Sequence, residues 1–170
     1  MRKNSCLVNI SMLVLALPAN LPEASQEYIL ALTGALTGPP SRTYAPAVDA
    51  LRIYIDGVNA KGGINGHKIK LILEDDSAQP SKAAAKLKKR ITTDKAILVV
   101  NASLSSTYAP MIQETKNAGV PLLFASGVCP QSVYPPADPL QFCTTGYASN
   151  YDSQAAMDFV KKTAKGPVKI

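Results

Sequence analysis

The 170-residue sequence contains a single histidine, His67, and only three cysteines. A triad of serine, histidine and aspartate needs a histidine beside its nucleophile, and most zinc sites need several histidine or cysteine ligands. His67 lies in a predicted turn, far in sequence from the cysteines, which excludes triad hydrolysis and most zinc chemistry. We expect its side chain to be solvated. The sequence predicts no catalytic residue, no metal site and no cofactor.

The sequence also lacks an apolar run long enough to span a membrane, which needs about 20 residues. An apolar stretch at residues 7–17 follows two basic residues and precedes small ones. This is the pattern of a secretory signal, and we predict a signal peptide at residues 1–24, cleaved after Ala19 or Ala24. An uncleaved tail or a mis-assigned start is the alternative. The chain is expected to be exported and not to be an integral membrane protein.

The formal net charge is +6, and five basic residues lie close together: Lys82, Lys86, Lys88, Lys89 and Arg90. A nucleic-acid surface would combine such a run with aromatic residues or a glycine-rich basic loop, and neither accompanies it. Apolar residues of the same segment share one helix face, so the run indicates a solvated helix face. No nucleic-acid partner is predicted.

Strand and helix periodicities alternate along the chain. Strands are predicted at residues 28–32, 69–74, 96–100, 120–125 and 140–144, with the start of another at 168–170. Helices are predicted at residues 46–58, 80–92, 106–117 and 149–163. This order predicts an α/β fold with a mostly parallel, doubly wound sheet in three layers and right-handed crossovers. Ligands of such sheets bind outside the carboxyl ends of the strands, here the loops 34–42, 76–79, 101–107 and 126–129.

Residues 59–76 combine a helix end, a tight turn and a strand that ends in acid. Two consecutive glycines suit the helix end, and an Asn-Gly pair suits a turn with positive φ at two positions. In this order the motifs resemble the solute-binding proteins of ABC transporters, in the family of the leucine/isoleucine/valine-binding protein. The loop at residues 36–39, Leu-Thr-Gly-Pro, matches the same family, and the resemblance covers residues 28–170.

The resemblance implies a type I periplasmic binding fold, with residues 25–170 as the N-terminal lobe, truncated before the second lobe. It implies a periplasmic or otherwise extracytoplasmic protein that captures an amino acid or related small carboxylate between two lobes for ABC permease subunits. The alternative is the ligand-binding region of a receptor or of a ligand-responsive regulator, which uses the same lobe. An enzyme is not expected, because the chain shows no phosphate loop and no nucleophile–base pair.

The best candidate site is the run of hydroxyl residues between the third predicted strand and the third helix. Ser105, Ser106 and Thr107 would bring hydroxyls and unpaired backbone amides to the strand ends, where they suit a ligand carboxylate. A plain helix cap is the alternative. The resemblance implies that Ser105 holds the ligand carboxylate.

Ser126 and Val128 follow the fourth predicted strand. In amino-acid binders of the resembling family, a backbone carbonyl and a threonine hydroxyl at these places hold the ligand ammonium. Val128 cannot accept that hydrogen bond, so an α-amino acid would leave part of its ammonium unpaired, at a cost of about 1–3 kcal/mol. This favours a carboxylate ligand without an α-amino group, such as an aromatic or aliphatic acid.

Four further side chains and one acidic run complete the candidates. Tyr44 and Tyr151 could wall a ligand, with ordinary helix packing as the alternative. Cys129 and Cys143 flank a proline-rich excursion and form a candidate disulfide in an oxidising compartment, metal binding being the weaker option. The acids at residues 74–76 are interpreted as caps of a strand end and its loop, because no partner nucleophile accompanies them.

Overall fold

The computed structural model describes residues 26–125, 127–144, 149–164 and 166. The predicted signal peptide and the predicted strand at residues 168–170 lie outside the described residues. The elements are, in chain order, β1 (Tyr28–Gly34), α1 (Ser41–Ala60), β2 (Ile69–Asp75), α2 (Pro80–Thr92), β3 (Leu98–Ala102), the 3-10 turn η1 (Ser105–Thr107), α3 (Tyr108–Ala118), β4 (Leu122–Phe124), the 3-10 turn η2 (Gln131–Val133), β5 (Gln141–Cys143) and α4 (Ser149–Thr163).

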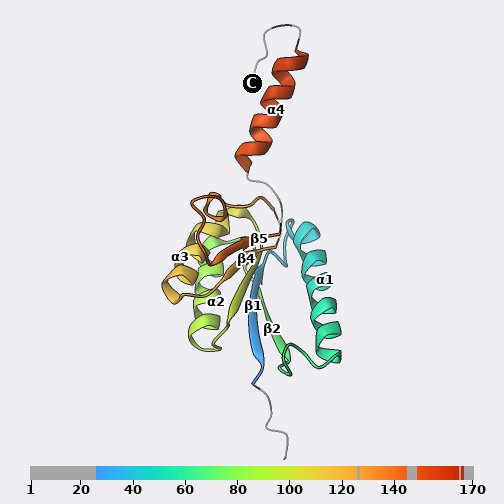
Figure 1. Ribbon diagram of the computed structural model, residues 1–170, viewed down its shortest axis with the longest axis vertical. Coiled ribbons are helices and arrows are strands. Elements are labelled where there is room, and N and C mark those ends of the chain that lie inside the picture. Colours follow the sequence, from blue (N-terminus) through green and yellow to red (C-terminus); the bar gives the residue numbers. More distant parts are fainter. Residues whose placement is uncertain (1–25, 126, 145–148, 165, 167–170) are drawn as a thin grey trace, which may run out of the picture.

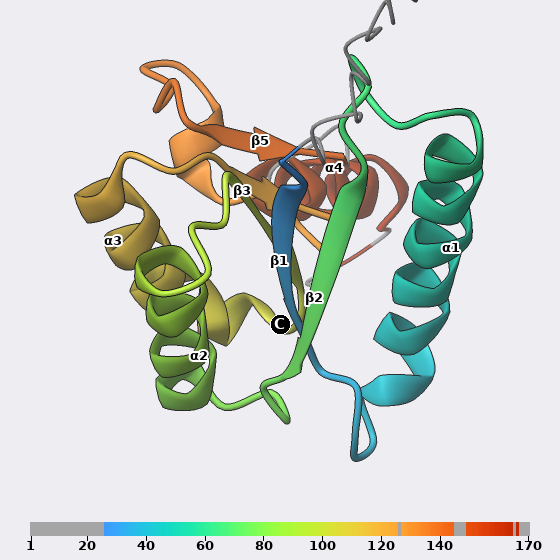
Figure 2. The same ribbon diagram turned by 90° about the horizontal axis from the view of Figure 1, so that it is seen from below.

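The five strands form one parallel sheet in the order β2-β1-β3-β4-β5 (Figure 1). Helix α1 lies on one face of the sheet, and α2 and α3 lie on the other (Figure 2). Strands buried on both faces read as nearly continuous apolar runs, as this sequence does. The predicted α/β fold with a doubly wound parallel sheet is confirmed.

Each face of the sheet has its own hydrophobic core. On the side of α2 and α3, Leu87, Met111 and Phe124 are fully buried. On the side of α1, Leu32 of β1 packs with Val48 and Val100. Successive strand residues point to opposite faces, so β3 sends Val99 into the first core and Val100 into the second. The alternation within one strand therefore joins the two helical layers.

Two helix starts differ from the sequence prediction. Helix α1 begins at Ser41, five residues earlier than expected. The φ of −66° at Pro40, which the proline ring imposes, already suits a helix start. The third helix begins as the 3-10 turn η1, in which the Thr107 amide donates to the Leu104 carbonyl at 2.9 Å, and becomes α-helical at Tyr108. Both starts extend the helix towards the carboxyl ends of the strands.

Helix α4 stands apart from the sheet and does not cover it (Figure 1). Its described side chains, residues 153–163, are exposed or half-buried, and Phe159 is 67% exposed. On the α1 side of the sheet, Leu98 and Leu123 are half-buried and Phe142 of β5 is 50% exposed. Among the described residues, no helix combines the length and the apolar character that crossing a bilayer requires.

The turn after α1 depends on backbone conformations that the sequence analysis expected. Gly63 has φ +80°, and a Cβ there would lie 2.0 Å from the His67 carbonyl oxygen. Asn65 and Gly66 both have positive φ, at 52° and 82°. His67 differs from its prediction: it is half-buried, its Nδ1 lies 2.6 Å from the Gln26 carbonyl oxygen, and its ring packs on a tyrosine. The expectation of a solvated His67 was wrong, because the segment before β1 lies against it.

Candidate functional site

Four loops leave the carboxyl ends of the strands on the same edge of the sheet. We call this edge the rim and define it as residues 35–40, 76–79, 103–107, 125 and 127–130. Ligands of parallel α/β sheets bind at such an edge. In a parallel sheet all strands end on the same side, so the loops that the sequence analysis selected converge here.

Ser105 and Ser106 are exposed on the rim, between the end of β3 and the start of α3. Neither side chain makes a hydrogen bond within the described part of the chain. Thr107 behaves differently. Its side chain is fully buried, and its hydroxyl and its amide both donate to the Leu104 carbonyl, at 2.8 and 2.9 Å. The Thr107 side chain is therefore not presented on the rim, and this residue holds the turn together.

Asp75 ties two loops of the rim together. One carboxylate oxygen accepts the backbone amides of Leu36 and Ser77, at 3.0 and 2.9 Å, and the other accepts the Thr37 hydroxyl at 2.5 Å. Partial burial raises the pKa of Asp75, but these hydrogen bonds outweigh it and bring the pKa to about 2. The cap predicted for this acidic run is present, and it connects the loop after β1 with the loop after β2.

Asp76, the next residue, is fully buried. Its Oδ1 accepts the Ser103 hydroxyl and the Ala78 amide, both at 2.8 Å. Its Oδ2 is buried and has no hydrogen-bond partner among the described residues. Burial raises the pKa of Asp76, and the Asp75 charge adds to this, although the bond from Ser103 opposes it. Two neighbouring carboxyl groups thus have pKa values displaced in opposite directions.

The basic residues of α2 are only partly the solvated face that the sequence predicts. Lys82, Lys88 and Lys89 are exposed, whereas Lys86 and Arg90 are half-buried. Lys86 Nζ lies 3.0 Å from Glu74, and Arg90 pairs with Glu74 and with Asp94. Burial raises the pKa of Glu74, but the bonds from Arg90 and Lys86 lower it below its usual value overall. The two ion pairs with Glu74 link α2 to the end of β2.

The aromatic candidates lie under the rim or outside the described side chains. Tyr44 is 8% exposed in α1 and packs inside the lobe. Burial, with a smaller contribution from Tyr44, raises the pKa of Tyr108 to about 12. A Cβ at Gly127 would lie 3.1 Å from the Tyr108 hydroxyl, so this phenol reaches the loop after β4. Tyr151 belongs to α4, and its side chain lies outside the described ones.

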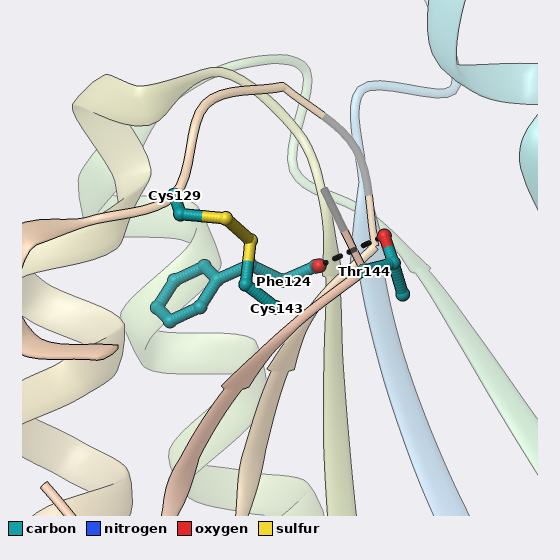
Figure 3. The surroundings of a disulfide bond; sticks show 4 residues. All are labelled: Phe124, Cys129, Cys143 and Thr144. Atoms are coloured by element: carbon teal, nitrogen blue, oxygen red, sulfur yellow. Dashed lines mark hydrogen bonds between the residues drawn. A yellow bond between two sulfur atoms is a disulfide. The ribbon is translucent and has the colours of Figure 1, made fainter. Parts of the chain in front are cut away.

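The loop after β4 carries the other two candidates. Val128 is half-buried, and Ser126 lies outside the described residues. One residue further on, Cys129 forms a disulfide with Cys143 of β5, with 5.9 Å between the two Cα atoms (Figure 3). Thr144 donates from both its amide and its hydroxyl to the Phe124 carbonyl, at 3.0 and 3.3 Å. The loop of Val128 is therefore attached to β5 next to its own strand.

The sequence analysis placed Asn101 and Ser103 within the candidate loop but did not predict that both are buried beneath the exposed serines. Both are fully buried. Asparagine and serine are uncommon in a fully buried position. Their place at the end of an apolar strand, beside a candidate loop, was the available signal.

Comparison with known proteins gives a consistent picture. A family model described as periplasmic binding protein matches residues 28–168. An amino acid binding protein of Pseudomonas aeruginosa is 38% identical over 76 residues, which cover 45% of this chain and 20% of that protein. A Leu/Ile/Val-binding protein of Citrobacter freundii is 26% identical over 133 residues, covering 78% of this chain and 36% of the relative.

Solved structures show the same fold. The branched-chain amino acid transporter substrate-binding protein LivJ of Streptococcus pneumoniae, in complex with isoleucine, matches with a TM-score of 0.71 and 20% identity, over 81% of this chain and 39% of that one. A type 1 periplasmic binding protein of Bordetella pertussis matches with a TM-score of 0.69 and 22% identity, over 81% and 38% of the two chains. The chain spans about two fifths of the length of these structures.

Proposed function

Since the chain belongs to the periplasmic binding protein family and resembles its Leu/Ile/Val-binding members, we propose that it is an extracytoplasmic solute-binding component of an ABC transporter. It captures an amino acid or a related small carboxylate and presents it to the permease subunits. The observation that carries the proposal is the exposed pair Ser105 and Ser106 on the rim. The family consists of binding proteins, and no catalytic role is assigned to the chain.

The rim at Ser105 favours an anion. The two serine hydroxyls donate hydrogen bonds, and the Ser105 and Ser106 amides at the start of η1 add donors together with the positive end of the helix dipole. A carboxylate bound here accepts from Ser105, with the Ser106 backbone beside it. Thr107 takes no part, because its hydroxyl and amide already bond to Leu104.

The second contact is the loop at Ser126 and Val128. The amino-acid binders of the family hold the ligand ammonium at these places through a carbonyl and a threonine hydroxyl. A valine side chain has no acceptor, so an α-amino acid would leave one ammonium proton unpaired, at a cost of about 1–3 kcal/mol. We therefore place an acid without an α-amino group ahead of an amino acid as the ligand.

The site is completed by a second lobe that closes over the rim. The chain spans about two fifths of the solved proteins that it matches, which supports residues 25–170 as the first lobe, exported by a signal at residues 1–24.

The proposal is tested by nuclear magnetic resonance titration of the 170-residue chain with two ligands, 4-methylpentanoate and L-leucine. The two molecules differ only in the α-amino group, which L-leucine has and 4-methylpentanoate lacks. We expect millimolar binding of 4-methylpentanoate, with the largest shifts at the Ser105 and Ser106 amides, and weaker binding of L-leucine. Val128→Thr should bring L-leucine closer to 4-methylpentanoate. Shifts that avoid residues 103–107, or identical titrations in Ser105→Ala, would contradict the assignment.

A further inference from the structure

A buried polar network lies directly beneath the exposed serines of the rim. The Asn101 amide donates to the Thr107 hydroxyl at 2.9 Å, and its oxygen accepts the Ser103 amide at 3.2 Å. Ser103 in turn donates its hydroxyl to Asp76 at 2.8 Å. Both ends of the loop 103–107 are thus bonded to fully buried side chains. The exposed residues Ser105 and Ser106 lie between these two anchors.

Asp76 is the member of this network that comes from another strand. Asp76 directly follows β2, whereas Asn101 lies in β3 and Ser103 directly follows β3. In the sheet, β1 lies between β2 and β3. Asp76 Oδ1 also accepts the amide of Ala78, which has φ +59°. One carboxylate oxygen therefore bonds two rim loops, the one after β2 and the one that carries Ser105 and Ser106.

A carboxyl group is a costly choice for this position. Burying an unpaired polar oxygen costs free energy, and Asp76 Oδ2 is buried with no hydrogen-bond partner in the described residues. Such costs persist at functional sites, where neighbouring residues hold the group in place. Three charged groups lie near Asp76: Asp75, Glu74 and Lys86 of α2. Lys86 pairs with Glu74, and its Nζ also donates to the Asp75 carbonyl at 2.8 Å.

We propose that Asp76 is a positioning residue for the ligand site: through Ser103 it holds the 103–107 loop in the conformation that presents the Ser105 and Ser106 hydroxyls. The inference rests on the proposed function for its meaning, because the serines matter only if they bind a ligand. The loop geometry itself is a separate property and is measured without any ligand.

The Thr107 amide reports whether the loop is closed, because it donates to the Leu104 carbonyl. Hydrogen–deuterium exchange at this amide is measured in the 170-residue chain, in Asp76→Ala, in Ser103→Ala and in the double variant. We expect each single substitution to speed exchange about tenfold, and the double variant to be no faster than either, because both remove the same hydrogen bond. Unchanged exchange in Asp76→Ala, or additive effects, would overturn the proposal.

Asp76→Asn separates positioning from general stability, and it also serves if Asp76→Ala does not fold. Its Oδ1 still accepts from Ser103 and Ala78, so Thr107 exchange should stay within about twofold of the wild-type rate. The wild-type amide shifts of Ser103 and Thr107 should follow an acid titration that Asp76→Asn abolishes. Asp75→Asn, the control, should retain it with a lower midpoint. A titration that survives in Asp76→Asn would contradict the assignment.

Titration with 4-methylpentanoate distinguishes this inference from the proposed function. If wild type binds it and Asp76→Ala binds it about tenfold more weakly, both hold. If Thr107 exchange responds as expected but wild type binds no 4-methylpentanoate, the loop support stands and the proposed function fails. If wild type and Asp76→Ala bind equally well, Asp76 does not position the site.

Discussion

Asp75 and Asp76 are adjacent residues of the same type, and their different surroundings give them different roles. Asp75 is half-buried and accepts four hydrogen bonds from two loops, which lowers its pKa to about 2. Asp76 is fully buried and leaves one oxygen unpaired, which raises its pKa. The first stabilises the rim as a carboxylate. The second costs stability when ionised and, in our proposal, positions a loop.

Asp75→Asn should destabilise the protein in a pH-dependent way. Because the folded pKa of Asp75 lies below its ordinary value of 3.8, its carboxylate stabilises the fold above that value, and the contribution is lost as the pH falls towards 2. We expect a loss of up to about 2 kcal/mol at pH 7, measured by urea unfolding of wild type and variant. The difference should shrink steadily between pH 4 and pH 2.5.

Asp94→Asn serves as the control, because Asp94 pairs with Arg90 away from the rim loops. A difference between wild type and Asp75→Asn that is the same at pH 7 and pH 2.5 would mean that the Asp75 charge contributes nothing to stability.

At the scale of elements, the segment between β4 and β5 is held by a covalent bond. The disulfide joins Cys129, just after the Val128 loop, to Cys143 at the end of β5. Ser132 within the excursion bonds Gln141 at 2.5 Å, and the Leu140 amide donates to Asp138 at 3.0 Å. The short strands β4 and β5 have three residues each, so the disulfide adds a covalent link to a short strand pair.

Replacing both cysteines by serine should lower the free energy of unfolding by roughly 3 kcal/mol, the chain-entropy value for a loop of this length. The cysteines are 14 residues apart in sequence. Urea unfolding with and without reductant provides the measurement. Wild type in reductant should match the double variant, and a double variant as stable as oxidised wild type would rule out a stabilising disulfide.

At the scale of the whole molecule, the structure is one α/β lobe with an open rim. A binding protein with two lobes buries its ligand between them, whereas one lobe covers only one side of the ligand. Helix α4 leads away from the sheet (Figure 1). Small-molecule sites bury most of the ligand surface, so a single lobe should hold its ligand weakly.

Isothermal titration of the 170-residue chain with the common L-amino acids should therefore detect no dissociation constant in the micromolar range. The expected affinity is millimolar or weaker, a free energy no more favourable than about −4 kcal/mol, against about −8 kcal/mol for micromolar binding. A micromolar or tighter constant for any amino acid would show that the lobe alone forms a complete site.

Prediction from sequence succeeded where the pattern is local. The apolar runs and helical spacings located every strand of the sheet, and the Asn-Gly pair located a turn with φ values of 52° and 82°. It failed for His67, because the Gln26 carbonyl that lies against its ring is 41 positions away along the chain. The prediction of a solvated basic face on α2 was half right, because Lys86 and Arg90 of this face pair with Glu74 of β2.

The sequence by itself determined the order of strands and helices, because periodicity and turn residues act within a few positions. Only the tertiary structure decided that Asp76 and Ser103, 27 residues apart, share a hydrogen bond and that Cys129 and Cys143 meet. Which side chains become neighbours depends on strand order and register, and no short stretch of sequence encodes those. The support of the rim is for this reason a property of the assembled sheet.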